Sequence, residues 1–282
     1  MRSLPCNGGN DRSGSVRFVW WEVLSVTVTE RAGIERSDDG EVAVVRLAHG
    51  PVSAMDVELC EAVAAQFRAL VADPARAVVL TGTGRSFSAG ADLRRFVAEG
   101  EPYARRFLPA LDAMFRAVFD LAKPVVAAVN GHAIAGGCVL AACADVTLMA
   151  EGKGRIGVPE LRVGVPFPRS AMEVVRYAVG DVAARRLMLG AQTYAVAQVH
   201  ALGLVDGVVA PELLLGQAVE RARALAADVP ADTFAFTKQQ LRRDARERMD
   251  RYADEDDATA ALWVRRATDG WTAAYLESVT GK

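Results

Sequence analysis

The sequence has little of several features that mark specialised classes of protein. Among 282 residues there are four cysteines and three histidines, and no apolar run reaches the ~18 residues of a transmembrane helix. The cysteines lack metal-ligand spacing, and two of them, Cys138 and Cys143, lie in apolar runs where a free thiol behaves as a small hydrophobic group. We therefore expect no metal site, no membrane partner and a reducing, cytoplasmic location.

An excess of charge of one sign is also absent. The chain has 33 basic and 35 acidic residues, a net charge of −2 and a pI near 6.0. The most basic run, residues 241–251 (LRRDARERMDR), alternates the two signs, which is typical of a solvated helix face. We expect no nucleic-acid partner.

The first 30 residues differ from the rest. They begin polar and glycine-rich, and the apolar stretch after Ser15 is interrupted by Arg17 and Glu22, so it does not form the apolar core of a signal peptide. We interpret residues 1–30 as an extension outside the core, and we expect it to be disordered. The remaining length favours one large core, residues 31–209, and an appended helical module, residues 210–282.

The core alternates short apolar runs rich in β-branched residues with longer amphipathic stretches, a pattern that predicts α/β architecture. Strands are predicted at Val42–Leu47, Ala77–Leu80, Val125–Val129 and Val146–Met149. Helices are predicted at Met55–Val71 and Pro102–Leu121, because each pattern stops just before a proline.

After a last short apolar run, Leu204–Val209, almost everything is helical in pattern. Trp263, Trp271 and Tyr275 lie on amphipathic helices and must bury their rings against the core or against another subunit. We favour self-association over packing on the chain's own core.

Two glycine-containing loops, residues 81–93 (TGTGRSFSAGADL) and 128–145 (AVNGHAIAGGCVLAACAD), each follow a strand and precede a helix. Gly136 and Gly137 start the second helix although each glycine costs it roughly 0.5–1 kcal/mol. Either close packing of helix on strand or the approach of a ligand explains them. Ligands bind at strand ends in open α/β sheets, where helix N-termini present free N–H groups.

Rival motifs fail in these loops. The dinucleotide pattern GxGxxG breaks at Phe87, no Gly-Lys-Ser/Thr follows for a P-loop, and the GxSxG of a serine hydrolase lacks its last glycine at Ser88. Two main-chain N–H groups can instead stabilise an oxyanion, each contributing on the order of 10²–10³ in rate. Such a site suits a carbonyl that becomes an enolate.

Three segments in this order, residues 86–93 (SFSAGADL), 130–137 (NGHAIAGG) and 159–166 (PELRVGVP), resemble the crotonase or enoyl-CoA hydratase/isomerase family. The resemblance implies an α/β fold, a crotonase-like spiral of repeated ββα units with a helical C-terminal oligomerisation module. It also implies an acyl-CoA thioester substrate, no cofactor beyond the coenzyme A of the substrate, and a homo-oligomer, a trimer or dimer of trimers.

The resemblance assigns the oxyanion hole to the N–H groups of Ala91 and Gly136, where a side chain at Gly136 would crowd the thioester. It also implies a set of residues that bind coenzyme A or line the acyl pocket, mostly through their backbones. These are Arg85, Ser86, Ser88, Ala89, Gly90, Asp92, Gly137, Val139 and Phe167. Arg85 is as readily a surface arginine, and Asp92 is also expected to cap a helix.

The catalytic acids separate the reactions of this family. Its hydratases have two glutamates, and this chain has Glu160 at one position and Val139 at the other. A single glutamate can still move a proton from the α-carbon of a β,γ-enoyl thioester to its γ-carbon. The resemblance therefore favours an isomerase, to which residues 50–55 (GPVSAM) are also more similar. Burial among apolar neighbours is expected to raise the pKa of Glu160 from about 4.3 toward 6–7.

Two alternatives remain open. One is a hydratase that uses a substitute acid such as Glu99, Glu101 or Asp112, although each is expected to lie at the surface. The other is a catalytically idle homologue that binds CoA thioesters. Dienoyl-CoA isomerase and dehalogenase activity are disfavoured because Pro168 stands where those enzymes have an aspartate.

Overall fold

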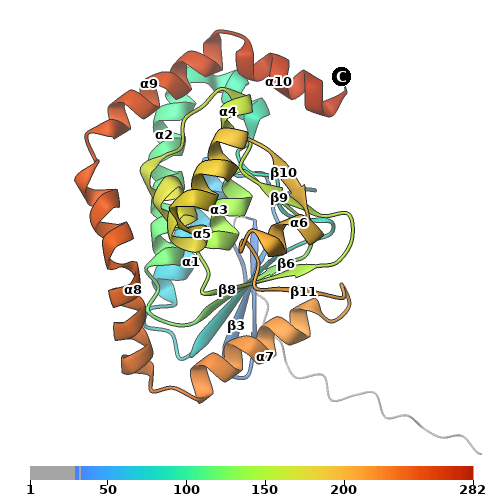
Figure 1. Cartoon of the computed structure of the whole chain (residues 1–282), viewed down its shortest axis with the longest axis vertical. Coiled ribbons are helices and arrows are strands. Elements are labelled where there is room, and N and C mark those ends of the chain that lie inside the picture. Colours follow the sequence, from blue (N-terminus) through green and yellow to red (C-terminus); the bar gives the residue numbers. More distant parts are fainter. Residues whose placement is uncertain (1–28, 32, 282) are drawn as a thin grey trace, which may run out of the picture.

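The computed structural model describes residues 29–31 and 33–281 (Figure 1). The predicted N-terminal extension, residues 1–30, therefore lies outside the described residues except for its last two. These two belong with Arg31 to β1 (Thr29–Arg31), which pairs antiparallel with β2 (Ile34–Asp39).

The chain forms two sheets. The larger one has the order β1-β2-β3-β4-β6-β8-β11, parallel from β3 onward, and the smaller one has the order β10-β9-β7-β5. In the larger sheet the further strands are β3 (Val42–Leu47), β4 (Ala77–Gly82), β6 (Val125–Val129), β8 (Val146–Ala150) and β11 (Gly207–Val209). In the smaller sheet they are β5 (Ser86–Ser88), β7 (His132–Ile134), β9 (Arg155–Gly157) and β10 (Thr193–Ala195).

A ββα unit repeats along the chain and confirms the predicted crotonase-like α/β spiral. Each unit gives one strand to each sheet and ends in a helix: β4-β5-α2, β6-β7-α3 and β8-β9-α4, with α2 at Leu93–Phe119, α3 at Gly136–Ala142 and α4 at Glu160–Val163. Because β5, β7 and β9 are parallel neighbours, their carboxyl ends share one edge. The three turns that start α2, α3 and α4 therefore meet there.

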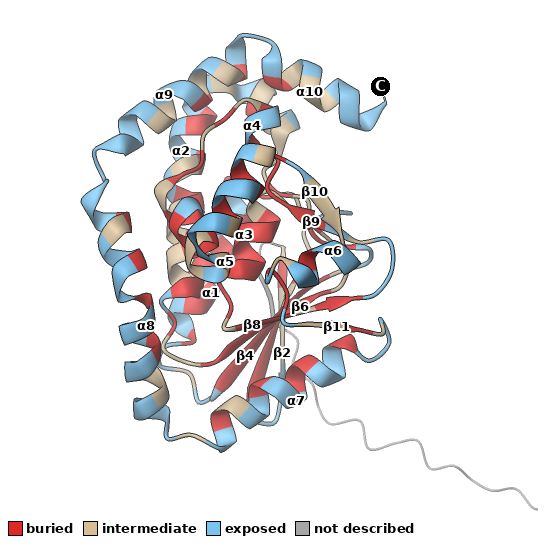
Figure 2. Ribbon diagram, viewed as in Figure 1, coloured by how far each residue is buried: buried red, intermediate tan, exposed pale blue. Residues whose placement is uncertain are grey.

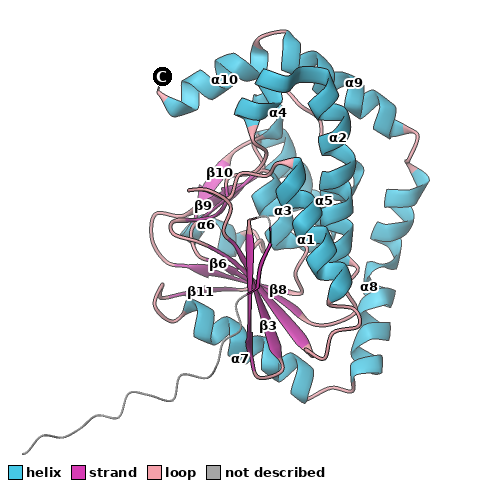
Figure 3. Cartoon of the chain, turned by 180° about the vertical axis from the view of Figure 1, so that it is seen from behind, coloured by secondary structure: helices cyan, strands magenta, loops and turns pink. Residues whose placement is uncertain are grey.

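Helices cover both faces of the larger sheet (Figures 1 and 3). The helices α1 (Val57–Ala69), α2, α3 and α5 (Arg169–Gly190) lie on one side, and α7 (Leu214–Ala227) lies on the other. In β3, Ala43 and Val45 join the first core, whereas Val42 and Val44 join the second core beneath α7. Burial on both faces explains why the central strands read as continuous apolar runs and appear red in Figure 2.

The predicted helix Pro102–Leu121 is the second part of a longer one. The helix α2 begins at Leu93 and is broken at Gly100, whose φ of 63° is outside the helical range. A short α6 (Val196–Ala201) precedes β11.

After α7, the chain continues as α8 (Ala231–Arg251), α9 (Glu255–Thr268) and α10 (Trp271–Thr280), which run along the outside of the molecule and over one end of α2 (Figure 1). Trp263 of α9 is 3% exposed, lies 5.4 Å edge-on from the ring of Phe96, and donates from Nε1 to the carbonyl of Pro166 at 3.0 Å. The preference for burial against another subunit is therefore wrong for Trp263. Self-association itself stays a prediction.

The charged residues of the basic run, residues 241–251 of α8, are mostly exposed as predicted, but Arg242 is buried. Arg242 is 2% exposed and Lys238 is 6% exposed, and both side chains bond to the carboxylate of Asp145, at 2.8 and 2.6 Å. Arg242 also donates to the carbonyls of Cys143 and Ala144 behind α3. The helix thus packs through buried cations that the charge pattern alone does not distinguish from exposed ones.

The thiols of Cys138 and Cys143 are buried, as their apolar runs predicted. Cys60 is likewise a buried free thiol, and no described group of histidine, cysteine and carboxylate residues could hold a metal ion. None of the described helices is both long and apolar enough to cross a membrane.

Candidate active site

The first turn of the candidate site follows β5 and contains Ala91. The main chain on both sides of Ala91 bonds to Met55: the carbonyl of Gly90 accepts from Met55 N at 2.7 Å, and the N–H of Asp92 donates to Met55 O at 2.8 Å. In this parallel pairing the N–H of Ala91 points the other way, and it has no acceptor within residues 33–281.

The second turn follows β7 and contains Gly136. Ala135 precedes it with φ 52° and ψ −122°, a strained conformation for a residue with a side chain. Gly136 is the first residue of α3, so its N–H has no acceptor inside the helix, and none among the described residues outside it. The positive end of the α3 dipole adds to this free donor.

The two turns touch. A Cβ placed on Gly90 would lie 2.9 Å from Cβ of Ala135 and 3.3 Å from N of Gly136. The structure therefore brings the two residues predicted to form the oxyanion hole, Ala91 and Gly136, onto adjacent strand-to-helix turns.

The two adjacent glycines of this turn are closely packed. A Cβ on Gly136 would lie 2.8 Å from Sδ of Met55, and a Cβ on Gly137 would lie 2.4 Å from the carbonyl oxygen of Ser88. The sequence left packing and ligand approach open as reasons, and packing against the main chain is sufficient for Gly137, whereas Gly136 meets only the flexible side chain of Met55 closely. The predicted approach of a thioester at Gly136 stays a prediction.

Glu160 lies on the third turn, after β9, as the first residue of α4. It is 7% exposed, and Oε2 is buried without a hydrogen-bond partner in the described chain. Burial raises the pKa of this carboxyl to about 8, above the predicted range, and its own N–H offsets part of the effect. Its charge contributes, after burial, to raising the pKa of the Cys138 thiol, which places Glu160 near α3.

The C-terminal helix holds the Glu160 turn, a feature that the sequence did not predict. Trp271 Nε1 donates to the carbonyl of Arg162 at 3.0 Å, and the buried hydroxyl of Thr272 donates to that of Val163 at 3.2 Å. Gly164, with φ 96°, ends α4 where a Cβ would lie 2.6 Å from Trp271 Cδ1. The α10 side chains thus donate to the last carbonyls of α4, for which the helix itself provides no N–H donor.

The hydroxyl of Ser88 belongs to the first turn rather than to a ligand groove. Ser88 is fully buried, donates to the carbonyl of Ser53 at 2.7 Å and accepts from the N–H of Gly90 at 3.2 Å. Ser86 is 5% exposed, and Ala89 donates its N–H to Val52. These positions leave main-chain atoms, rather than hydroxyls, for any contact with coenzyme A.

The other residues predicted to bind coenzyme A or line the acyl pocket differ in how far they are exposed. Arg85 is exposed, whereas Val139 is fully buried on α3 and Phe167 is 7% exposed. Asp92 is the predicted helix cap, because it accepts from the N–H groups of Arg94 and Arg95 at 3.0 and 3.1 Å.

None of the three substitute acids is free. Glu99 pairs with Arg95, Glu101 pairs with Arg105, and Asp112 pairs with Arg116, the first two at exposed positions as expected. Glu173 is also buried, but Arg176 and Arg248 neutralise it. Glu160 therefore differs from all of these in being buried without a basic partner.

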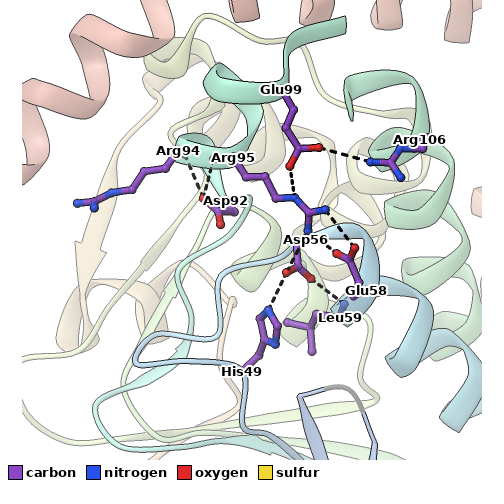
Figure 4. Close-up of polar contacts among 9 residues, drawn as sticks. All are labelled: His49, Asp56, Glu58, Leu59, Asp92, Arg94, Arg95, Glu99 and Arg106. Atoms are coloured by element: carbon purple, nitrogen blue, oxygen red, sulfur yellow. Dashed lines mark hydrogen bonds and ion pairs between the residues drawn. The ribbon is translucent and has the colours of Figure 1, made fainter. Parts of the chain in front are cut away.

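A polar network, also missed from the sequence, joins the starts of α1 and α2 next to the first turn (Figure 4). Asp56 caps α1 by accepting from the N–H of Leu59 at 2.8 Å, and His49 Nε2 lies 2.7 Å from its Oδ2. Arg95 reaches Glu58 at 2.5 Å and Asp56 at 3.6 Å from α2. Asp56, which follows Met55, therefore caps α1. Asp92, which follows Ala91, caps the neighbouring helix α2.

A groove of about 400 Å³ lies elsewhere, at the amino ends of β4 and β6, between α7 and α8. Ala75, Lys123 and Phe234 are among its lining residues. Since the turns described above follow the carboxyl ends of β5, β7 and β9 in the smaller sheet, this groove is not part of the candidate site.

Two mainly parallel sheets built from repeated ββα units, with free turn amides and a buried carboxylate at one sheet edge, are typical of the crotonase class of α/β proteins. The chain belongs to the enoyl-CoA hydratase/isomerase family, whose model matches residues 37–274. It is an acyl-CoA enzyme of that superfamily.

Individual relatives carry both activities in their names. The chain is 38% identical over 208 residues to a putative enoyl-CoA hydratase of Thermus thermophilus, covering 71% of this chain and 79% of that protein. An enoyl-CoA hydratase structure from Mycobacterium ulcerans matches with a TM-score of 0.75 and 27% identity, over 80% of this chain and 99% of that one. The human mitochondrial delta3-delta2-enoyl-CoA isomerase shares the fold, with a TM-score of 0.79 and 24% identity over 88% of this chain and 97% of that one.

Proposed function

We propose that this chain is an enoyl-CoA isomerase that shifts a double bond from the β,γ to the α,β position of an acyl-CoA thioester. The observation that carries the proposal is the state of Glu160: a buried carboxyl with an unpartnered Oε2 and no second acid beside it, since Val139 occupies the position of the other glutamate.

The reaction balances with this one residue. Ionised Glu160 takes a proton from the α-carbon, and the electron pair moves into the thioester carbonyl to form an enolate. The N–H groups of Ala91 and Gly136 stabilise the enolate oxygen. Protonated Glu160 then returns the proton to the γ-carbon as the double bond forms between the α- and β-carbons, which regenerates the base.

A raised pKa suits this role. A carboxyl with a pKa near 8 holds the proton between the two transfers more readily than an ordinary glutamate, and roughly a tenth of it is ionised and able to act as the base at pH 7. We propose that coenzyme A lies along the first turn, contacting the backbones of residues 86–90, with Arg85 near a phosphate and Phe167 toward the acyl chain.

Hydration is the second candidate, because the Thermus relative and most of the similar curated proteins are named hydratases. Adding water needs one group to activate the water and another to protonate the α-carbon. The arginine pairs of Glu99, Glu101 and Asp112 support isomerisation over hydration.

The test compares a 3-enoyl-CoA and crotonyl-CoA as substrates of the purified full chain, with Glu160→Gln and, as a control at an exposed acid, Glu99→Gln. We expect isomerisation of the 3-enoyl-CoA, hydration at least ~10²-fold slower, and a ~10²-fold or larger fall in kcat for Glu160→Gln alone. Rapid hydration of crotonyl-CoA without isomerisation would overturn the proposal. Tight thioester binding with no turnover would favour the idle homologue.

A further inference from the structure

Met55 contacts both halves of the candidate oxyanion hole, once through its main chain and once through its side chain. Its N–H and carbonyl bond to the residues on either side of Ala91, at 2.7 and 2.8 Å. These two bonds fix the peptide planes around Ala91, so they determine the direction in which its free N–H points.

The side chain of Met55 continues to the other turn. It is fully buried, and its Sδ would lie 2.8 Å from a Cβ on Gly136, with its Cε at 3.8 Å. Gly136 therefore presents its bare Cα to the thioether, and the sulfur occupies the space that a larger residue at position 136 would need.

The two turns also touch directly at Gly90 and Ala135, so Met55 is not needed to bring them near each other. The contact between Gly90 and Ala135 does not by itself fix how each turn is rotated, and this rotation sets the direction of its free N–H. Ala135 is held at φ 52°, a conformation that persists only when its surroundings restrict it. A side chain packed on Gly136 supplies such a restriction.

The backbone of Met55 is itself anchored. The next residue, Asp56, caps α1 and bonds to His49, and Arg95 ties the first turn of α1 to the first turn of α2 (Figure 4). The network thus fixes the strand-like pairing of Met55 with Ala91 from the solvent side, while the thioether reaches the buried side.

We propose that Met55 is a positioning residue that sets the mutual orientation of the Ala91 and Gly136 N–H groups. The inference rests on the proposed function, in which these groups bind the thioester oxygen. Because an oxyanion hole acts through donors aimed in advance, loss of the thioether weakens the stabilisation of the enolate more than the binding of the substrate.

The test uses Met55→Leu, Met55→Val and Met55→Ala, side chains of decreasing reach toward Gly136. Met149→Ala is the matched control, because Met149 is also fully buried but lies on β8, packed against Gly154. The readouts are kcat and KM for a 3-enoyl-CoA, thermal unfolding, and the red shift in absorption of a bound chromophoric α,β-unsaturated acyl-CoA whose carbonyl accepts hydrogen bonds.

For Met55→Val and Met55→Ala we expect kcat to fall ~10- to 100-fold, KM to change less than ~3-fold, and the red shift to shrink, because small misplacements of reacting groups cost this much. Met55→Leu retains most of the wild-type shift and rate. Met149→Ala lowers the unfolding temperature but leaves the shift unchanged.

A folded Met55→Ala with the wild-type red shift, or with the same kinetic loss as Met149→Ala, would overturn the inference. If Met55→Ala does not fold, Met55→Val decides by the same readouts. An absent red shift in the wild type is a different result, because it contradicts the proposed oxyanion hole itself.

Discussion

Glu160 is a residue whose burial costs stability and supports the proposed chemistry. A carboxyl that is 7% exposed and has no basic partner is unfavourable when ionised. Such costs are typical of groups retained for function rather than for the stability of the fold. This cost grows as the pH rises, because the pKa of Glu160 is higher in the folded chain than in the unfolded chain.

We predict that Glu160→Gln makes the protein more stable at pH 8 but not at pH 4.5. Below pH 4.5 both folded and unfolded chains carry the protonated acid, so burial adds no cost of ionisation. Between pH 4.5 and about 8 the unfolded chain loses this proton while the folded chain keeps it, which lowers the free energy of unfolding of the wild type. The glutamine avoids this loss, so the gain at pH 8 is ~1–4 kcal/mol.

Denaturant unfolding at the two pH values measures this difference. Glu99→Gln is the control, since Glu99 is exposed and paired with Arg95. An equal effect of Glu160→Gln at both pH values, or a loss at pH 8, would show that the folded chain does not hold the raised pKa.

Residues of the candidate site were predictable where a motif places them at the end of a strand, as for Ala91, Gly136 and Glu160. The hydroxyl of Ser88 was not, because its role depends on the carbonyl of Ser53, which the sequence does not place within reach. Met55 was likewise read as the start of a helix and as part of the stretch 50–55, without a role between the two turns.

At the scale of elements, α10 is joined to the catalytic turn. The helix α4 is a single turn of four residues, too short to be stable by itself. The donors on Trp271 and Thr272 bond two of its carbonyls and keep its first residue, Glu160, in its buried position.

We predict that the double variant Trp271→Phe, Thr272→Val lowers kcat ~3- to 10-fold with little change in KM, because the turn loosens and water reaches Glu160. The same access of water lowers the apparent pKa in the pH–rate profile. The control Phe236→Ala removes an exposed ring from α8 and leaves both quantities unchanged. A wild-type pH–rate profile in the double variant would exclude this role of α10.

The central strands of the larger sheet followed from their apolar runs, since strands buried on both faces need no polar alternation. The mostly polar strands β1 and β2 of the same sheet were not predicted. The strands of the smaller sheet were missed because each has three residues, too few to show a period. The start of α2 at Leu93 followed from the expected cap at Asp92, but Gly100 interrupts the periodicity, so only Pro102–Leu121 was predicted as a continuous helix.

At the scale of the whole molecule, α8 packs against the core through two buried basic side chains, those of Lys238 and Arg242. Asp145 accepts from Lys238 and Arg242 and also from the N–H of Val125 at the start of β6. Asp145 thus joins α8 to the larger sheet. Burial lowers the pKa of Lys238 to about 8, although the carboxylate of Asp145 acts in the opposite direction and raises it.

We predict that Asp145→Asn destabilises the protein by ~3–5 kcal/mol, because two buried cations lose their carboxylate while the side chain keeps its shape. The control Asp250→Asn breaks an exposed pair with Arg116 and costs at most ~1 kcal/mol. Denaturant midpoints compare the two variants. Equal losses would mean that the buried ion cluster contributes no more than a surface pair.

The sequence by itself determined the α/β class, the order of the central strands along the chain, and the three turns that carry Ala91, Gly136 and Glu160. The class and the strands depend on local apolar runs, and two of the turns on glycines in strand-to-helix loops, whereas Glu160 was placed by the resemblance of residues 159–166 to a family motif. Only the tertiary structure decided that Trp263 packs on its own core, that Arg242 is buried, and that Met55 and α10 hold the turns. Those outcomes depend on contacts between residues far apart in the chain, whose partners no local pattern identifies.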